Sequence, residues 1–158
     1  MFPPPDQTAI FVPIGIAITI TFCTVVMHAL SMMPVIYFVR YELRIGRAGV
    51  AFRKDVVIVA GAVVVALAAH LVAIATWALV FSLCGEFPQL TEAFYHSGLN
   101  YTTLGDPAVM SPTWRLLAPL EGANGMLMFG VSTALLFAVI QRLIQTRLSE
   151  PINHETII

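Results

Sequence analysis

The stretch FPQLTEAFYHSGLNYTTLGDP, Phe87 to Pro107, decides the fold, because it sets a short helical pattern and a compact polar loop between two long apolar runs. The helical part covers about a dozen residues, too few to cross a membrane, and fits a helix that enters and leaves on one side. Pro88 suits a first helical turn, and Glu92 complements the helix dipole at that end. The polar loop begins at Thr102.

The regions around this stretch have a composition suited to lipid. The chain has 158 residues, of which 58% are hydrophobic and only 11% charged, whereas about a quarter of a soluble domain is charged. Three runs are long enough to cross a bilayer: Ala9–Met33, Val56–Cys84 and Leu116–Ile140. A lone segment in lipid must satisfy its own backbone, so each run is expected to be helical. The sequence therefore predicts an all-α membrane protein with three transmembrane helices plus a short re-entrant helix.

The basic residues predict how the chain is oriented. Five lie in the segment Tyr37–Asp55 and two follow the third apolar run: Arg40, Arg44, Arg47, Arg53 and Lys54, then Arg142 and Arg147. Basic residues next to spans stay on the cytoplasmic side, so this segment and the C-terminus are expected inside and the N-terminus outside. The segment is either an amphipathic stretch on the anionic inner leaflet or a solvated basic loop, and both interpretations stay open. The net charge of −1 indicates no nucleic-acid partner.

The loop Thr102–Asp106 has the chemistry to hold a dehydrated cation. An ion in a bilayer loses its hydration, and backbone carbonyls that several chains aim at one axis can replace the water oxygens. Irregular backbone at membrane depth must be buried by protein or line water, so the loop is expected at a subunit interface. The partly negative C-terminal end of the short helix favours cations, the Thr103 hydroxyl adds a ligand, and Gly105 permits backbone angles closed to other residues.

Two segments resemble the pore region of the potassium-channel superfamily, in particular its small bacterial ion-channel proteins: AFYHSGLNYTTLGD and WRLLAPLEGANGMLMFGVSTALLFAV. The resemblance is good over residues 87–141 and rests on position and hydrophobicity alone over 56–84. It implies a potassium-channel-like pore with a re-entrant pore helix, in a homotetramer that passively transports K⁺ or Na⁺ across the bacterial inner membrane. No catalytic step and no cofactor beyond the permeant ions is expected, and the partners would be copies of the chain and membrane lipids. Residues 56–145 would be the pore module, between an N-terminal segment with an extra span (1–55) and a cytoplasmic tail (146–158).

The loop departs from the family pattern Thr-Val-Gly-Tyr-Gly-Asp. Thr103, Leu104 and Gly105 match its inner part, but Asp106 and Pro107 stand where the family has tyrosine and glycine. This order is closer to the non-selective members, which keep Thr-Val-Gly-Asp-Gly. The resemblance thus implies that Thr102–Asp106 bind ions in a shortened row of carbonyl sites, below a mouth ringed by four Asp106 carboxylates. It does not rank K⁺, Na⁺ and Ca²⁺.

The third apolar run carries candidates for a pore-lining helix. Small residues interrupt it, so that Gly125 or Gly130 is either a gating hinge or a site of close helix packing. One helical stripe is predicted to face an inner cavity: Asn124, Met128, Val131 and Leu135. Glu121, an ionisable residue in a span, is expected to pair with Arg115 or to hydrogen-bond behind the loop.

Two histidines in the spans raise a different class of function. Haem can be held between helix histidines, but counting residues from the ends of the runs places His28 and His70 about 7 Å apart in depth, which argues against one haem. Polar packing is preferred, with pH sensing by His70 or His96 left open. The main alternative to conduction is a channel-derived structural subunit that has lost its filter, since TLGDP differs from the family pattern.

Overall fold

The computed structural model describes residues 8–49 and 52–149, and within them it contains four helices and no strand. The helices are α1 (Thr8–Arg44), α2 (Phe52–Leu83), α3 (Leu90–Tyr101) and α4 (Leu117–Ser149). Three of them, α1, α2 and α4, are long and apolar enough to cross a membrane. The predicted all-α fold with three spans and one short helix is therefore confirmed. At about 1.5 Å per residue the long helices measure roughly 48 to 56 Å, more than the ~30 Å of hydrocarbon they must cross.

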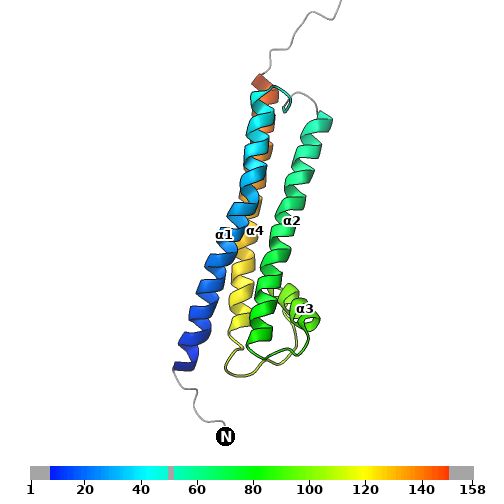
Figure 1. Ribbon diagram of the computed structural model, residues 1–158. Coiled ribbons are helices and arrows are strands. Elements are labelled where there is room, and N and C mark those ends of the chain that lie inside the picture. The colour runs from blue at the N-terminus through cyan, green and yellow to red at the C-terminus, as the bar shows by residue number, and fades with distance from the viewer. Residues whose placement is uncertain (1–7, 50–51, 150–158) are drawn as a thin grey trace, which may run out of the picture.

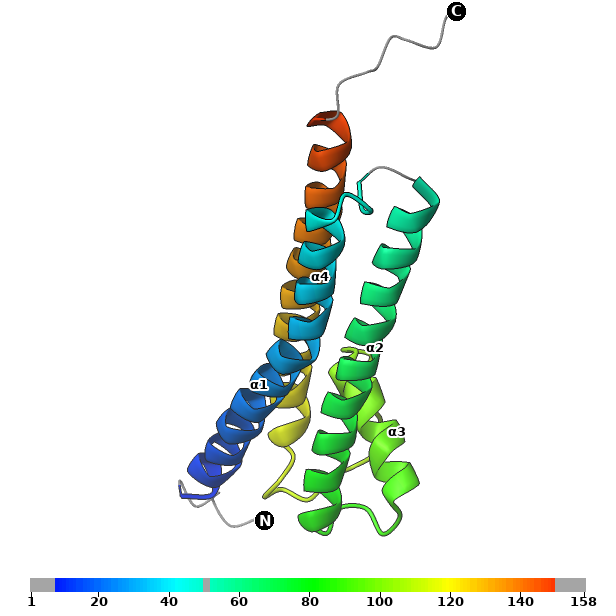
Figure 2. The same cartoon turned by 45° about the horizontal axis from the view of Figure 1, so that its top comes forward.

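The three long helices lie side by side, and α3 sits against one end of α2 (Figures 1 and 2). α1 and α4 run in the same direction and α2 runs in the opposite one. The chain therefore enters and leaves α3 at the same end of the bundle, which is what a re-entrant helix requires. The turn between α1 and α2 lies at the other end, beside the C-terminal end of α4.

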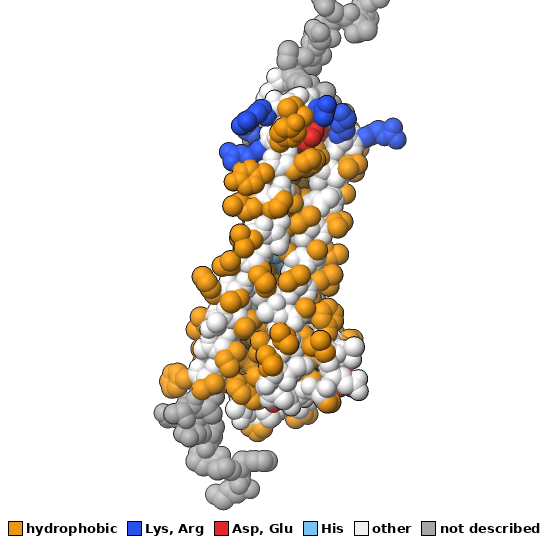
Figure 3. Space-filling view, in the orientation of Figure 1, with side chains coloured by type: hydrophobic (Ala, Val, Ile, Leu, Met, Phe, Trp, Pro, Cys, Tyr) orange, Lys and Arg blue, Asp and Glu red, His pale blue; other side chains and the backbone are white. Residues whose placement is uncertain are grey.

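Small and large side chains are distributed as lipid requires. On α2 a stripe of alanines is buried against the other helices: Ala62, Ala66, Ala69 and Ala73. Small residues at this spacing let membrane helices approach closely. Large apolar side chains point outward along the spans, as the space-filling view shows (Figure 3), and Phe22, Leu67 and Phe137 are each more than half exposed. In a membrane these side chains meet acyl chains, so their exposure is not a defect.

Two helices continue past the predicted span ends. α1 runs on from Met33 to Arg44, through much of the segment predicted to be a leaflet-bound stretch or a basic loop. Residues Tyr37–Arg44 therefore continue α1 and form neither a loop nor a separate leaflet-bound segment. α4 likewise continues past Ile140 to Ser149. Charged residues can prolong a helix outside the bilayer, because water and headgroups accept their side chains there.

The basic end of the bundle is closed by one carboxylate. Asp55 Oδ1 accepts the backbone N–H of Gly49 at 2.8 Å, and Asp55 Oδ2 forms an ion pair with Arg147 of α4. The Arg147 guanidinium also lies over the Phe52 ring, 5.6 Å from its centroid. These contacts join the α1–α2 turn to the end of α4.

At the opposite end, α3 rests directly on the backbone of α4. A Cβ atom at Gly125 would lie 1.9 Å from the Tyr101 carbonyl oxygen, and one at Gly122 would lie 3.2 Å from the Asn100 carbonyl oxygen. Gly130 has nothing within 4 Å of its Cβ position. Close packing therefore explains Gly125 but not Gly130.

Gly125→Ala is expected to destabilise the protein, because the atom that the new methyl meets is backbone and cannot rotate away. Overpacking of this kind costs about 1–3 kcal/mol. Gly130→Ala is the matched control, and it should be neutral or gain up to about 1 kcal/mol from the higher helix propensity of alanine. Thermal unfolding of both variants in detergent measures the difference, and equal melting temperatures would contradict the packing described here.

Candidate functional site

The C-terminal end of α3 is capped by the backbone N–H groups of the loop that follows it. The N–H of Thr103 donates to the Asn100 carbonyl at 2.8 Å, and the N–H groups of Leu104 and Gly105 both donate to the Leu99 carbonyl at 2.9 and 3.1 Å. The residue at the turn, Thr103, has φ 64°, in the left-handed region. This is the Schellman arrangement that normally uses glycine. A β-branched residue there is an outlier that costs free energy and tends to mark functional sites.

The carbonyl oxygens of the same loop are left without partners. Within residues 8–49 and 52–149, no hydrogen bond is donated to the carbonyls of residues 102–105, although the N–H group of each residue is used. Thr102, Thr103, Leu104 and Gly105 are all exposed on the single chain. Unsatisfied carbonyls at membrane depth are costly unless water, an ion or another chain meets them. The loop thus presents a row of free acceptors.

The two threonine hydroxyls of the loop differ. Thr102 Oγ1 donates to the Gly98 carbonyl at 2.7 Å and so belongs to the helix cap. The Thr103 hydroxyl makes no hydrogen bond in the part of the chain described by the structure. Thr103 lines a hollow of about 400 Å³ together with Asp106 and with Gly122 and Met126 of α4. Thr103 and Gly105 of the loop therefore border the same hollow beside α4.

Asp106 is turned toward its own chain. Its Oδ1 accepts the Ala108 backbone N–H at 3.0 Å, and its Oδ2 lies 2.8 Å from His96 Nδ1 on α3. The Ala108 hydrogen bond is the main reason that the pKa of Asp106 lies below its ordinary value; partial burial opposes this, and the hydrogen bond and charge of His96 add to the lowering. Both carboxylate oxygens are therefore engaged within the chain, and the ring of four Asp106 carboxylates at a pore mouth stays a prediction.

His96 connects the loop to α3 and was not predicted to do so. Its Nε2 lies 2.8 Å from the Asn100 amide nitrogen, so one imidazole bridges Asp106 and Asn100. The ring is buried and packs against Phe81 and Phe87, at centroid distances of 4.9 and 4.6 Å. The spacing of His96 and Asn100, four residues apart on one helical face, was the available signal.

Glu121 is also bonded to α3. It is fully buried, and its carboxyl bonds the Ser97 hydroxyl, which donates to the Ile74 carbonyl of α2 at 2.8 Å. Within residues 8–49 and 52–149, Glu121 bonds neither Arg115 nor the loop 102–106, so its observed partner on α3 differs from both expectations. Glu121 joins α2, α3 and α4 at the level of the α3 helix.

The span histidines meet in the middle of the bundle. Nε2 of His28 and Nε2 of His70 each lie 2.9 Å from Ser132 Oγ, and the ring centroids are 4.9 Å apart. The expected 7 Å difference in depth is wrong, because the helices tilt and their ends are not level. Ser132 donates to the Met128 carbonyl, so both imidazoles must donate from Nε2, and Tyr101 can then donate to His70 Nδ1 at 3.0 Å. The rings touch each other and leave no room for a macrocycle between them.

The four residues of the predicted pore-lining stripe have different surroundings in the structure. Asn124 and Met128 are buried inside the chain, and Asn124 Nδ2 donates to Thr24 Oγ1 of α1 at 3.1 Å. Leu135 faces α1 at a groove between the two helices, and Val131 is 46% exposed. This stripe therefore mostly faces α1, and the exposed face of α4 on the loop side carries other residues.

The Asp106 hydrogen bonds predict a pH-dependent stability. Because the folded pKa lies below that of the unfolded chain, ionised Asp106 contributes stability that is present above the unfolded pKa of about 4 and lost as the pH falls through the folded pKa. Asp106→Asn should thus melt at a lower temperature than the wild type near pH 7, and the difference should shrink at lower pH. Melting curves in detergent across this range measure it, and a gap that stays constant with pH would contradict it.

The comparisons with known proteins bear on the segment that contains this site. No curated protein and no solved structure matches the chain. A family model described as ion channel matches residues 56–142, which span α2, α3, the loop with free carbonyls and most of α4. The match covers more than half of the 158 residues and has the order span, short helix, loop, span on which the site is built. The chain therefore belongs to this ion channel family.

Proposed function

We propose that the chain is one of four identical subunits of a cation channel that passively transports K⁺ and Na⁺. The observation that carries this proposal is the row of free carbonyls at residues 102–105, each exposed and without a hydrogen-bond donor in the described part of the chain. With the free Thr103 hydroxyl, these oxygens are the ligands expected for a dehydrated cation. Nothing in the proposal requires a catalytic step.

The sign of the transported ion follows from the same geometry. The loop lies at the C-terminal end of α3, where the helix dipole is negative. Carbonyl oxygens and the Asp106 carboxylate add negative potential, and Arg115 is the only Lys or Arg in the 85–115 connection. A short row of carbonyls with no second glycine supports weak discrimination among monovalent cations. Permeation of Ca²⁺ is measured in the liposome flux assay described below.

Assembly of four chains would shield the exposed loop from lipid. In one chain the residues that carry the free carbonyls are exposed, and lipid does not tolerate unpaired carbonyls at membrane depth. A ring of four copies would place them around a common axis. We assign the basic end of the bundle to the cytoplasm of a bacterial cell and the α3 end to the outside, because Lys and Arg near spans are retained inside.

The exposed face of α4 on the loop side is the proposed lining of the ion cavity on the cytoplasmic side of the loop Thr102–Asp106. Met126 borders the hollow that Thr103 and Asp106 also line. Gly130, Thr133 and Phe137 follow Met126 at helical spacing, and all are exposed on the single chain. These residues replace the stripe that contains Asn124 and Met128.

Conduction is tested by cation flux into liposomes with a matched pair of glycine variants. Gly105 (φ 74°) and Gly85 (φ 76°) both have left-handed backbones and open space at Cβ, but only Gly105 belongs to the loop. Alanine costs about 1–2 kcal/mol at either position. Gly105→Ala should lower K⁺ and Na⁺ flux roughly tenfold by turning carbonyls off the axis, whereas Gly85→Ala should conduct like the wild type.

Chloride is the control ion, and cross-linking of the purified protein should give four chains. Wild-type vesicles that pass no cation above empty vesicles would refute conduction and support a structural subunit. Equal loss in both variants would show that Gly105 acts through stability alone.

The lining is tested by cysteine modification in a Cys23→Ala, Cys84→Ala background. A charged methanethiosulfonate should reduce flux through Thr133→Cys, because the attached charge would stand in the cation path. Val131→Cys is exposed on a different face of α4, so its modification should leave flux unchanged. Loss of flux on modification of Val131→Cys without loss on modification of Thr133→Cys would contradict this lining and favour the stripe predicted from the sequence.

A further inference from the structure

The basic residues of this chain are concentrated at one end. Every Lys and Arg except Arg115 lies in the last turns of α1, the α1–α2 turn, the first turn of α2 or the last turns of α4, and Figure 3 shows Lys and Arg gathered at one end of the bundle. This end of the bundle is therefore at the level of lipid headgroups. Within it, Arg147 and a group of three other arginines have different surroundings.

The charge of Arg147 is neutralised, and the charges of the other three arginines are not. Arg147 is paired with Asp55 on the α2 side of α4. On the α1 side, Arg40, Arg44 and Arg142 form no salt bridge with any carboxylate in residues 8–49 and 52–149, although three like charges stand around one groove. Like charges held together in this way favour the binding of an anion.

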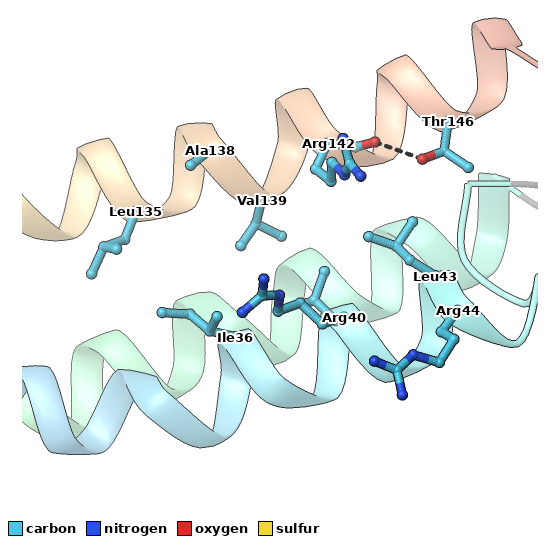
Figure 4. Close-up of a pocket in the computed structure, with 10 residues that line it drawn as sticks. Ile36, Arg40, Leu43, Arg44, Leu135, Ala138, Val139, Arg142 and Thr146 are labelled. Atoms are coloured by element: carbon cyan, nitrogen blue, oxygen red, sulfur yellow. Dashed lines mark hydrogen bonds between the residues drawn. The ribbon is translucent and has the colours of Figure 1, made fainter.

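The groove lies between α1 and α4 and has a volume of about 620 Å³. In Figure 4, Arg40 of α1 and Arg142 of α4 lie over the space between the two helices, with Arg44 one turn further along α1. Away from the arginines the walls are apolar and include Ile36, Leu135 and Val139. The site is thus basic at the end of the bundle and apolar toward its middle.

We propose that this groove binds one anionic phospholipid. Guanidinium groups recognise phosphate oxygens through paired, charge-assisted hydrogen bonds, so the headgroup would lie on Arg40, Arg44 and Arg142. The acyl chains would follow Ile36, Leu135 and Val139 toward the middle of the bilayer. A free phosphate would use only the basic part, which leaves the apolar wall unexplained; basic pockets between helices on the cytoplasmic side suit lipid headgroups. The site depends on the chain spanning a membrane and not on conduction.

Native mass spectrometry of the purified protein tests this with phosphatidylglycerol and, as the neutral lipid, phosphatidylcholine of the same acyl chains. The wild type should retain phosphatidylglycerol in preference to phosphatidylcholine. Arg40→Gln, Arg142→Gln together should weaken retention of phosphatidylglycerol about tenfold or more. The control is Arg53→Gln, Lys54→Gln, which removes the same charge at the same end of the molecule but outside the groove.

Two further arms separate this site from simpler explanations. Leu135→Trp fills the apolar wall without changing charge and should also reduce phosphatidylglycerol retention, which keeps the test decisive if the glutamine variant does not fold. Inorganic phosphate at millimolar concentration should not displace the lipid. Equal loss in the Arg53, Lys54 control, equal retention of phosphatidylcholine, no effect of Leu135→Trp, or displacement by phosphate would each overturn the proposal.

Discussion

The contact on which the rest of the structure depends is the seating of the C-terminal end of α3 on the backbone of α4. No side chain larger than hydrogen fits at Gly125, because the Tyr101 carbonyl occupies the place of a Cβ atom. With the helix end held there, the N–H groups of residues 103–105 bond carbonyls of α3, and the carbonyls of residues 102–105 have no donor within the described residues. The presence of free carbonyl oxygens in the loop therefore follows from how the helix ends. A side chain at Gly125 would displace the loop as a whole.

Buried polar groups hold this arrangement where lipid provides no hydrophobic drive between helices. Ser132 of α4 accepts from His28 of α1 and His70 of α2, and His70 accepts from Tyr101 of α3, so one network includes all four helices. Ser97 bonds both Ile74 and Glu121 nearer the α3 end of the bundle. A polar group left unpaired in this environment costs more than its bond contributes, so such networks favour one arrangement over its alternatives.

The parts of the fold that depend on composition were predictable, and those that depend on relative depth and rotation of helices were not. Length and apolar content predict three spans and one re-entrant helix, because lipid allows a single helical segment few other structures. The predicted difference in depth between His28 and His70 was wrong, because counting residues from the ends of apolar runs ignores helix tilt. For α4, periodicity finds a stripe that contains Asn124 and Met128 but cannot say which neighbour it faces; Thr24 of α1 decides that. The link from Asp106 to His96 joins residues on a helix and a loop, and only the turn at Thr103 brings them together.

The additional helix α1 lies outside the segment that matches the ion channel family, yet residues of that segment depend on it. Asn124 and Ser132 are buried polar residues of α4 whose partners Thr24 and His28 belong to α1. Without α1 both would face hydrocarbon with fewer bonds, at a cost of about 1–3 kcal/mol each. α1 is thus bonded at Thr24 and His28 to the same helix on which the α3 end rests, and the groove with Arg40 and Arg142 lies between the same two helices at the basic end. The physical unit that positions the loop is therefore the whole four-helix chain, larger than the two spans and short helix of the family segment.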